Sequence, residues 1–286
     1  MEVLLILGLV VIVGGLKIAA FFAFPIWLRW TGRMAPRKAN RAHRDLIEPH
    51  IETVYPEGDG PFPAVLLFHG CGGVRQISHN YANLAARNGI AALIVDSLTP
   101  RGIDYETALE TVCKGKTLWG RERASDVYAA LEIARDDPKV DAQRLGLAGW
   151  SHGGWAILDG LALHAMGTAP DGLIEVPDAP FDGVKAILLM YPFGSRPSLA
   201  RTHSLNADAD ISAILVKSDT HAKETHVEAI LKREQAAGHK VSWELFSDVT
   251  HGFEEPDHHP ESILRYDAEA TARAEQIFTQ TFGHKL

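Results

Sequence analysis

The stretch RLGLAGWSHGGWAILDGLAL, residues 144–163, is the part of the chain that decides the fold. It begins as a short apolar run typical of a buried strand, turns through Gly-x-Ser-x-Gly and continues as a helix. Gly149 and Gly153 flank Ser151, and glycine tolerates a tight turn with close backbone neighbours. Such a strand–turn–helix places a serine hydroxyl at the edge of a sheet, above a helix N-terminus that favours negative charge. Ser151 is therefore the predicted nucleophile.

On both sides of this stretch, short apolar runs alternate with helix-like segments. Continuous apolar runs indicate strands covered on both faces, and strand–helix alternation is typical of a parallel sheet. We predict an α/β fold with a mostly parallel sheet of about seven to eight strands and helices on both faces. Strands are expected at 64–69, 91–96, 144–149, 186–191, 213–217 and 241–246, with a leading strand near 50–55. Helices are expected at about 78–88, 122–135, 152–165, 223–237 and 261–282, and long loops at 97–121 and 192–210.

A serine hydroxyl is a weak nucleophile until a base accepts its proton, so a histidine oriented by a carboxylate is required. In this fold the chain order is nucleophile, acid, histidine. His251, in the segment THGF after the last expected strand, is the candidate base. Asp219, which ends the run AILVKSD, is the candidate acid. Asp248 and Asp96 compete for that role, but Asp96 precedes the serine and Asp248 lies only three residues before the histidine.

An oxyanion hole needs two backbone N–H donors beside the nucleophile. One is expected from His152, the residue that follows Ser151. The other is expected from the loop HGCGG, residues 69–73, which follows an expected strand. Its glycines let the backbone approach a reacting carbonyl group closely, and Cys71 N–H is the candidate second donor.

Several motifs in this order resemble the dienelactone hydrolase family of α/β-hydrolases. They are FHGCGG, VDSLTPRG, RASDVYAALEIA, RLGLAGWSHGG, LVKSD and THGF. The resemblance covers roughly residues 50–282 and implies an eight-stranded type of sheet, no cofactor, and a triad on Ser151, Asp219 and His251. Dienelactone hydrolases proper carry cysteine at the nucleophile position. The serine here therefore favours hydrolysis of an ester other than a dienelactone.

The charge distribution divides the chain into a basic N-terminal segment and an acidic body. Residues 1–44 hold seven of the 28 Lys and Arg residues but only one of the 36 acids. The remainder therefore has 21 basic and 35 acidic residues, which leaves no basic footprint for phosphates and argues against a nucleic-acid partner. Two cysteines exclude a disulfide-rich scaffold and a zinc site built from cysteine alone. The acids and histidines of EEPDHHP are interpreted as a solvated loop, so no metal is expected.

The first thirty residues predict a membrane anchor. Residues 3–28 contain one charge, Lys17, and as a helix would span ~39 Å, more than the ~30 Å of a bilayer core. A cleaved signal peptide or a buried helix is the alternative. We expect residues 1–30 to be the anchor, with the lipid bilayer as partner through residues 3–28. Residues 31–48 then form a basic juxtamembrane linker, and residues 49–286 an α/β-hydrolase domain.

The basic flank also predicts orientation. Six bases between Arg29 and Arg44 follow the apolar run, and positive flanks favour the cytoplasmic side. We expect a single-pass protein of bacterial inner-membrane type with its catalytic domain in the cytoplasm rather than outside. Cys71 and Cys113 belong to loops at the same sheet edge, so a disulfide is conceivable. A reducing cytoplasm instead predicts two free thiols.

The substrate is less defined by the sequence than the chemistry. Arg75, Arg101, Arg121 and Arg196 lie on or beside the expected active-site loops and are candidates for binding a substrate carboxylate. Trp150 is a candidate wall of an apolar pocket. The predicted function is a serine hydrolase acting on a small-molecule ester or lactone. An acyltransferase, a peptidase, and a catalytically silent membrane-tethered binding module are the alternatives.

Overall fold

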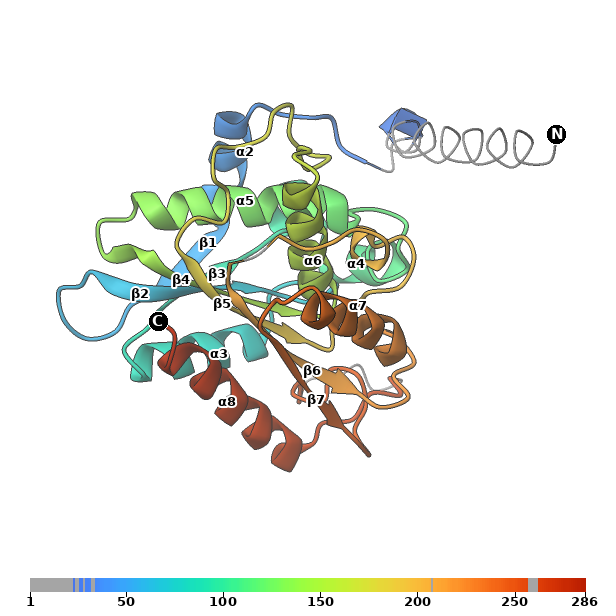
Figure 1. Cartoon of the computed structure of the whole chain (residues 1–286). Coiled ribbons are helices and arrows are strands. Elements are labelled where there is room, and N and C mark those ends of the chain that lie inside the picture. The colour runs from blue at the N-terminus through green and yellow to red at the C-terminus, as the bar shows by residue number, and fades with distance from the viewer. Residues whose placement is uncertain (1–22, 24–25, 28, 32–33, 207, 257–261) are drawn as a thin grey trace.

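A seven-stranded sheet runs through the centre of the computed structural model, which describes residues 23, 26–27, 29–31, 34–206, 208–256 and 262–286 (Figure 1). The strands are β1 (Ile51–Val54), β2 (Phe62–Phe68), β3 (Ala91–Val95), β4 (Val140–Trp150), β5 (Val184–Met190), β6 (Asp210–Val216) and β7 (Val241–Phe246). Their order is β1-β3-β2-β4-β5-β6-β7, and only the pair of β1 with β3 is antiparallel. The mostly parallel α/β sheet predicted from the sequence is confirmed, with seven strands.

The inner strands are buried on both faces along most of their length, which explains their continuous apolar sequences. In β2, Leu66 and Phe68 pack into the core on one face of the sheet, whereas Val65 and Leu67 pack into the core on the other face. Side chains alternate between faces along a strand, so a strand covered on both sides needs an apolar residue at every position.

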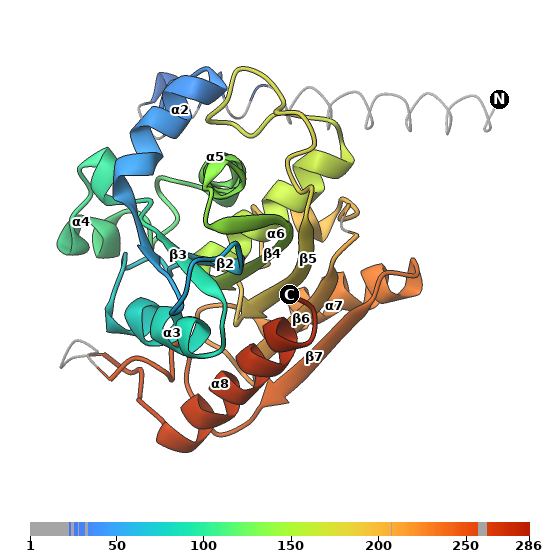
Figure 2. The same cartoon turned by 90° about the vertical axis from the view of Figure 1, so that its left-hand side faces the viewer.

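Helices supply the two covering layers (Figures 1 and 2). One layer contains α2 (Asn40–Ile47), α5 (Gly120–Asp136), α6 (His152–Ala165) and α7 (Glu224–Ala236). The other contains α3 (Gln76–Arg87) and α8 (Ala268–Gly283), which lie side by side. This arrangement brings the carboxyl ends of the parallel strands to one edge of the sheet, where loops can assemble a site.

Two helices differ from the sequence-based expectation. The segment 97–121, expected to be a loop, contains the short helix α4 (Tyr105–Glu110), whose first turn is capped by the Asp104 side chain. The last helix begins at Ala268 rather than near residue 261, because the Asp267 carboxylate accepts a hydrogen bond from Ala270 N–H at 2.9 Å. Both boundaries are set by aspartate caps, which satisfy N–H groups that a first turn leaves free.

The expected linker at 31–48 ends earlier than predicted. Residues 40–47 form α2, which packs against α5. Ile47 is fully buried, and the ring of His43 lies 2.8 Å from the Asp126 carboxylate of α5. The hydrolase domain therefore includes α2, so its boundary at residue 49 is corrected. The segment looked like a linker because only two of its eight residues are buried.

The expected membrane anchor at residues 3–28 lies almost entirely outside the described residues. Among the residues that the structure describes, no helix combines the length and apolar character needed to cross a bilayer.

Replacing Ile47 with alanine tests whether α2 belongs to the domain. Because the side chain is fully buried in the core, Ile47→Ala should lower the free energy of unfolding by about 2–5 kcal/mol, measured by urea denaturation. Arg41→Ala, at an exposed position of the same helix, should change it by less than about 0.5 kcal/mol. If both substitutions had equally negligible effects on the free energy of unfolding, residues 40–47 would belong to the linker and not to the domain.

Candidate active site

The turn between β4 and α6 holds Ser151 in a strained backbone conformation. Its φ is 49° and its ψ is −105°, a region that residues with side chains seldom adopt. The flanking glycines make the turn possible. A Cβ at Gly149 would lie 2.7 Å from the Gly153 carbonyl carbon, and a Cβ at Gly153 would overlap the Phe68 carbonyl oxygen of β2. Ser151 N–H donates to Met190 O at 2.8 Å, which ties the turn to the end of β5.

The structure brings together the three residues predicted to form a triad. His251 Nε2 lies 2.8 Å from Ser151 Oγ, and His251 Nδ1 lies 2.7 Å from Asp219 Oδ2. Ser151 follows β4, Asp219 follows β6, and His251 follows β7, so all three come from loops at one edge of the sheet. The three side chains therefore form one continuous chain of hydrogen bonds.

Hydrogen bonds keep Asp219 ionised. Burial raises the pKa of this carboxyl, but hydrogen bonds from the His251 ring and from two backbone N–H groups outweigh burial and bring its pKa below the usual value. Those N–H groups belong to His221 and Ala222, at 2.8 and 3.0 Å from Oδ1. An ionised carboxylate only accepts hydrogen bonds, so His251 Nδ1 must carry a proton. In the neutral ring, Nε2 is then free to accept the serine proton.

Aromatic rings fix the plane of the His251 imidazole. The His221 ring stacks on it with centroids 5.2 Å apart, and the Tyr191 ring meets it edge-on at 4.7 Å. The Tyr191 hydroxyl donates to Glu254 at 2.9 Å, and Tyr81 donates to the same carboxylate. Burial raises the pKa of Glu254 to about 7, although its hydrogen bonds act in the opposite direction. The base is thus supported from two sides.

A cavity of about 670 Å³ opens directly onto the serine. Cys71 and His152, the expected oxyanion donors, line it together with Ser151 and His251. Aromatic and aliphatic side chains form much of the remaining wall, namely Tyr105, Leu109, Val112, Trp150, Trp155, Tyr191, Phe193 and Leu264. The site therefore combines a mainly apolar wall with a few polar groups, as small-molecule pockets usually do.

The two cysteines form a disulfide, which corrects the expectation of free thiols. Cys71 and Cys113 are bonded, with their Cα atoms 5.1 Å apart. The distance is within the range that a disulfide can span. The bond connects the loop of the expected oxyanion donor to the segment that follows α4, and both cysteines line the cavity.

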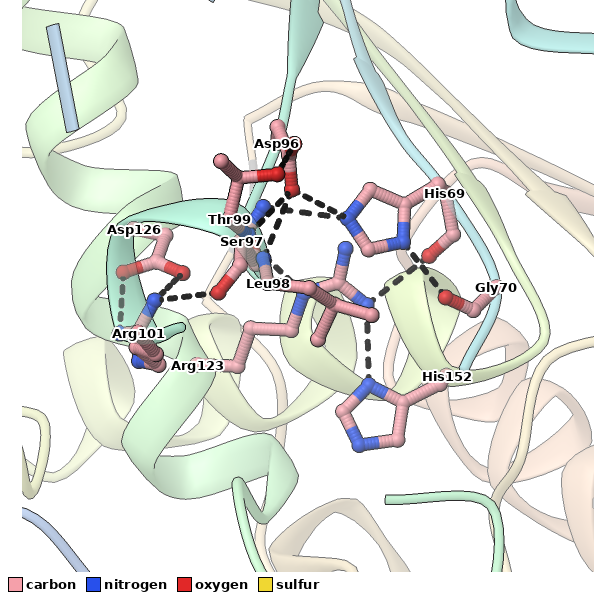
Figure 3. Close-up of polar contacts among 10 residues, drawn as sticks. All are labelled: His69, Gly70, Asp96, Ser97, Leu98, Thr99, Arg101, Arg123, Asp126 and His152. Carbon is pink, nitrogen blue, oxygen red and sulfur yellow. Dashed lines mark hydrogen bonds and ion pairs between the residues drawn. The ribbon is translucent and has the colours of Figure 1, made fainter. Parts of the chain in front are cut away.

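The expected substrate-binding residues separate into two groups. Arg75 and Trp150 line the cavity, and the Arg75 guanidinium lies 4.9 Å from the Tyr105 ring centroid and 3.4 Å from Glu255. Arg101 does not line this cavity, which corrects its assignment. It instead forms a two-point ion pair with buried Asp126, at 2.8 and 3.0 Å (Figure 3).

Neither competing acid is the partner of His251 Nδ1, which is hydrogen-bonded to Asp219. Asp96 accepts hydrogen bonds from Leu98 N–H at 2.8 Å and Thr99 N–H at 3.1 Å, which occupy it as a turn cap. Asp248 is exposed on the loop before the histidine. Among the described residues, no group of His, Cys, Asp and Glu side chains is arranged to hold a metal ion. His258 and His259, of the segment EEPDHHP, lie outside those residues.

Arg121, another candidate for binding a substrate carboxylate, does not line the cavity, which corrects its assignment. It belongs to the polar start of α5. Arg121, Glu122, Arg123, Ser125 and Asp126 are all buried there, behind the serine turn. The signal was the cluster RERASD directly before the apolar run VYAALEIA. Five polar residues within six positions usually indicate a solvated helix face, so their burial could be found only from the tertiary arrangement.

Comparisons with known proteins agree with this architecture. Residues 172–286 match the model of the dienelactone hydrolase family, and residues 76–167 match that of the prolyl oligopeptidase family. The resemblance to dienelactone hydrolases is thus confirmed over the C-terminal part of the chain. No curated protein matches the sequence.

Solved structures give the fold as that of the α/β-hydrolases. A dienelactone hydrolase from Anabaena variabilis is 21% identical, with a TM-score of 0.56 over 82% of this chain and 91% of the other. A dienelactone hydrolase-like promiscuous phosphotriesterase from metagenomic libraries is 19% identical, with a TM-score of 0.60 over 81% and 92%. An esterase from Thermogutta terrifontis is 15% identical, with a TM-score of 0.57 over 82% and 90%.

Adding one methyl group at Gly153 should disrupt the turn. Because its Cβ would overlap a carbonyl oxygen of β2, Gly153→Ala should lower the free energy of unfolding by about 1–3 kcal/mol or more and reduce ester turnover at least ~100-fold. Gly283→Ala is the matched control, since a Cβ there meets no atom within 4 Å. A Gly153→Ala protein with normal turnover would show that the turn is not tightly constrained.

The disulfide predicts a thiol count and a redox effect. Protein denatured and quenched at harvest should show no free thiol, and two after reduction. The bond closes a loop with a sequence separation of 42, so its loss should cost up to roughly 4 kcal/mol of stability. Reduction should also lower turnover roughly 10-fold by loosening the Cys71 loop. Cys113→Ser should match the reduced protein and be insensitive to reductant; two thiols at harvest would contradict the bond.

Proposed function

We propose that the chain is a serine hydrolase that cleaves a carboxylic ester or lactone through an acyl-enzyme on Ser151. The supporting observation is the hydrogen-bond chain from Ser151 through His251 to Asp219, opening into a cavity. Histidine acting as base, with a carboxylate that holds its tautomer, is the arrangement that activates a serine hydroxyl.

The proposed reaction has two symmetrical halves. His251 Nε2 accepts the serine proton while Oγ attacks the substrate carbonyl, and Asp219 stabilises the imidazolium that forms. The tetrahedral oxyanion is placed between the backbone N–H groups of Cys71 and His152. Collapse expels the alcohol, which takes its proton from His251. Water then attacks the acyl-enzyme with the same histidine as base, releasing the acid.

The cavity favours a small substrate with an apolar part. Trp150, Trp155 and Phe193 contribute apolar atoms to the wall of the cavity that holds Ser151. Arg75, Lys114 and exposed Arg196 contribute positive charge to the cavity lining. Arg75 is paired with Glu255, and Lys114 is paired with Glu110. These features support an ester or lactone of drug-like size, with the apolar group against the aromatic wall.

The other activities considered share the same nucleophile. A silent binding module would not require an ionised acid, a correctly oriented histidine and a strained serine together. A peptidase is kept as a competitor because residues 76–167, which include the serine turn, match the prolyl oligopeptidase family. An acyltransferase would differ in the final acceptor, with an alcohol taking the place of water.

The proposed location combines an anchor over residues 3–28 with a catalytic domain on an oxidising side. The anchor rests on the sequence alone. The disulfide between Cys71 and Cys113 favours an oxidising compartment, because such bonds persist there and are reduced in the cytoplasm. This proposal is opposite to the orientation that the basic flank predicts.

Substitutions in the triad test the proposed function with a panel of p-nitrophenyl esters. Ser151→Ala should lower kcat on the order of 10⁴- to 10⁶-fold and abolish labelling by a fluorophosphonate probe. Asp219→Asn should lower kcat by roughly 10⁴-fold or somewhat less, because the amide no longer holds the productive tautomer. Asp248→Asn, the same chemical change at an exposed position, should stay within about twofold of wild type.

Two results would contradict this assignment. Normal turnover by Asp219→Asn together with an inactive Asp248→Asn would identify the other aspartate as the acid. If the chain cleaved a peptide p-nitroanilide but hydrolysed no ester, the assignment would change from esterase to peptidase.

A further inference from the structure

Arg123 of α5 is fully buried behind the serine turn and makes three hydrogen bonds (Figure 3). Its Nε donates to Ser97 Oγ at 2.9 Å, and its Nη1 donates to His69 O and to His152 Nδ1, each at 2.9 Å. These acceptors follow β3, follow β2 and begin α6, respectively. One guanidinium therefore joins three separate segments at the edge of the sheet.

Two of these segments carry the expected oxyanion donors. His69 is the first residue of the loop that contains Cys71, and its carbonyl is the acceptor for Arg123. His152 supplies the other donor from its own backbone, and its ring is the acceptor for Arg123. The distance between the two backbone N–H groups thus depends on a side chain that binds both segments at once.

The histidine rings in this cluster are held neutral, as these hydrogen bonds require. His152 Nδ1 accepts a hydrogen bond from Arg123, so it carries no proton. His69 Nε2 accepts from Ser97 N–H at 3.1 Å. Burial first and the Arg123 charge second lower the pKa of His69 to about 3, and the same two causes bring the pKa of His152 well below its usual value.

The charge of Arg123 is not neutralised by direct contact with a carboxylate. Its three acceptors are uncharged, and no described carboxylate forms an ion pair with it. Asp126, the acid with the largest electrostatic effect on Arg123, is paired with Arg101 and His43. Burial lowers the pKa of Arg123 to about 10, which still leaves it charged at neutral pH.

Arg123 differs in this respect from two neighbouring arginines, one part-buried and one buried. Arg101 forms its two-point pair with Asp126, and Arg121, two residues before Arg123 on the same helix, is paired with buried Asp171. An arginine that serves only the packing of a buried layer is expected to have a carboxylate partner of this kind. Arg123 instead directs its charge toward the backbone that surrounds the serine.

We propose that Arg123 is the positioning residue of the oxyanion hole, which holds the Cys71 and His152 donors at a fixed separation and keeps positive charge behind the developing oxyanion. The proposal rests on the proposed serine hydrolase function. A preorganised donor pair and a nearby charge stabilise the tetrahedral intermediate more than the bound ester, because the negative charge develops only in the former. The expected effect is therefore on kcat rather than on KM.

The test compares Arg123→Met, Arg123→Lys and Arg121→Met in the full chain. Beside kcat and KM for one p-nitrophenyl ester, it measures the inhibition constants of a trifluoromethyl ketone with the same acyl group and of the corresponding secondary alcohol. The ketone adds to the serine and forms an oxyanion, whereas the alcohol cannot. Arg121→Met is the control because it also removes a buried guanidinium of α5 but leaves the contacts of Arg123 intact.

Arg123→Met should lower kcat on the order of 10- to 100-fold and weaken the ketone by a similar factor. KM and the affinity for the alcohol should stay within about twofold. Arg123→Lys keeps the positive charge but loses the planar guanidinium with its several N–H donors. Its kcat and its affinity for the ketone should lie between those of Arg123→Met and wild type. Arg121→Met should retain wild-type kcat and ketone affinity. Equal losses in Arg121→Met and Arg123→Met, or a ketone affinity unchanged by Arg123→Met, would overturn the proposal.

If Arg123→Met does not fold, Ser97→Ala and Arg123→Lys together test the role of Arg123. Ser97→Ala removes the acceptor of Nε and leaves every expected donor of the hole in place. It should lower kcat and ketone affinity together by roughly 3- to 10-fold. Wild-type values of both quantities in both variants would overturn the role of Arg123. A wild-type chain that neither reacts with a fluorophosphonate nor hydrolyses an ester would instead contradict the proposed function itself.

Discussion

The backbone conformation of Ser151 is the constraint on which the rest of the site depends. With φ at 49°, the residue is held where two glycines allow α6 to begin immediately beneath the end of β4. Gly153 must pass so close to Phe68 of the neighbouring strand that no side chain fits. The packing of α6 against β2 therefore holds Ser151 in its strained backbone conformation. His251 and Asp219 need only be placed by loops at the same sheet edge.

Beneath that edge of the sheet, buried basic groups lie on one side and a buried acidic group lies on the other. On one side, Arg121 of α5 is paired with buried Asp171, and Arg101 is paired with buried Asp126 of α5, whereas buried Arg123 has no ion-pair partner among the described carboxylates. On the other side, Glu254 accepts hydrogen bonds from two tyrosines, and burial raises its pKa to about 7. Buried polar groups of this kind are costly unless satisfied, so their hydrogen bonds define one arrangement of the loops rather than several. The site is consequently supported from both layers of helices.

The sequence predicts best those features that a local residue pattern and the order of motifs along the chain are sufficient to define. Most strands were predicted because they are short apolar runs, and the hydrogen-bonded arrangement of Ser151, His251 and Asp219 was predicted because each residue follows one of these runs. Features that depend on a distant partner were missed. Helix α2 looks polar because only His43 and Ile47 face the domain. Arg101 looked like a pocket residue because Asp126, its partner, lies 25 positions away in the sequence. The disulfide could not be predicted from the sequence alone, because the bond depends on how α4 and the segment after it pack against the Cys71 loop.

A crystal structure of the chain after reaction with a phosphonate ester tests the proposed acyl-enzyme and oxyanion hole most directly, because the adduct resembles the tetrahedral intermediate. We expect a covalent bond from phosphorus to Ser151 Oγ, with the phosphoryl oxygen about 2.7–3.1 Å from the backbone nitrogens of both Cys71 and His152. An adduct on another residue, or a phosphoryl oxygen turned to solvent without contact to either nitrogen, would contradict the proposal.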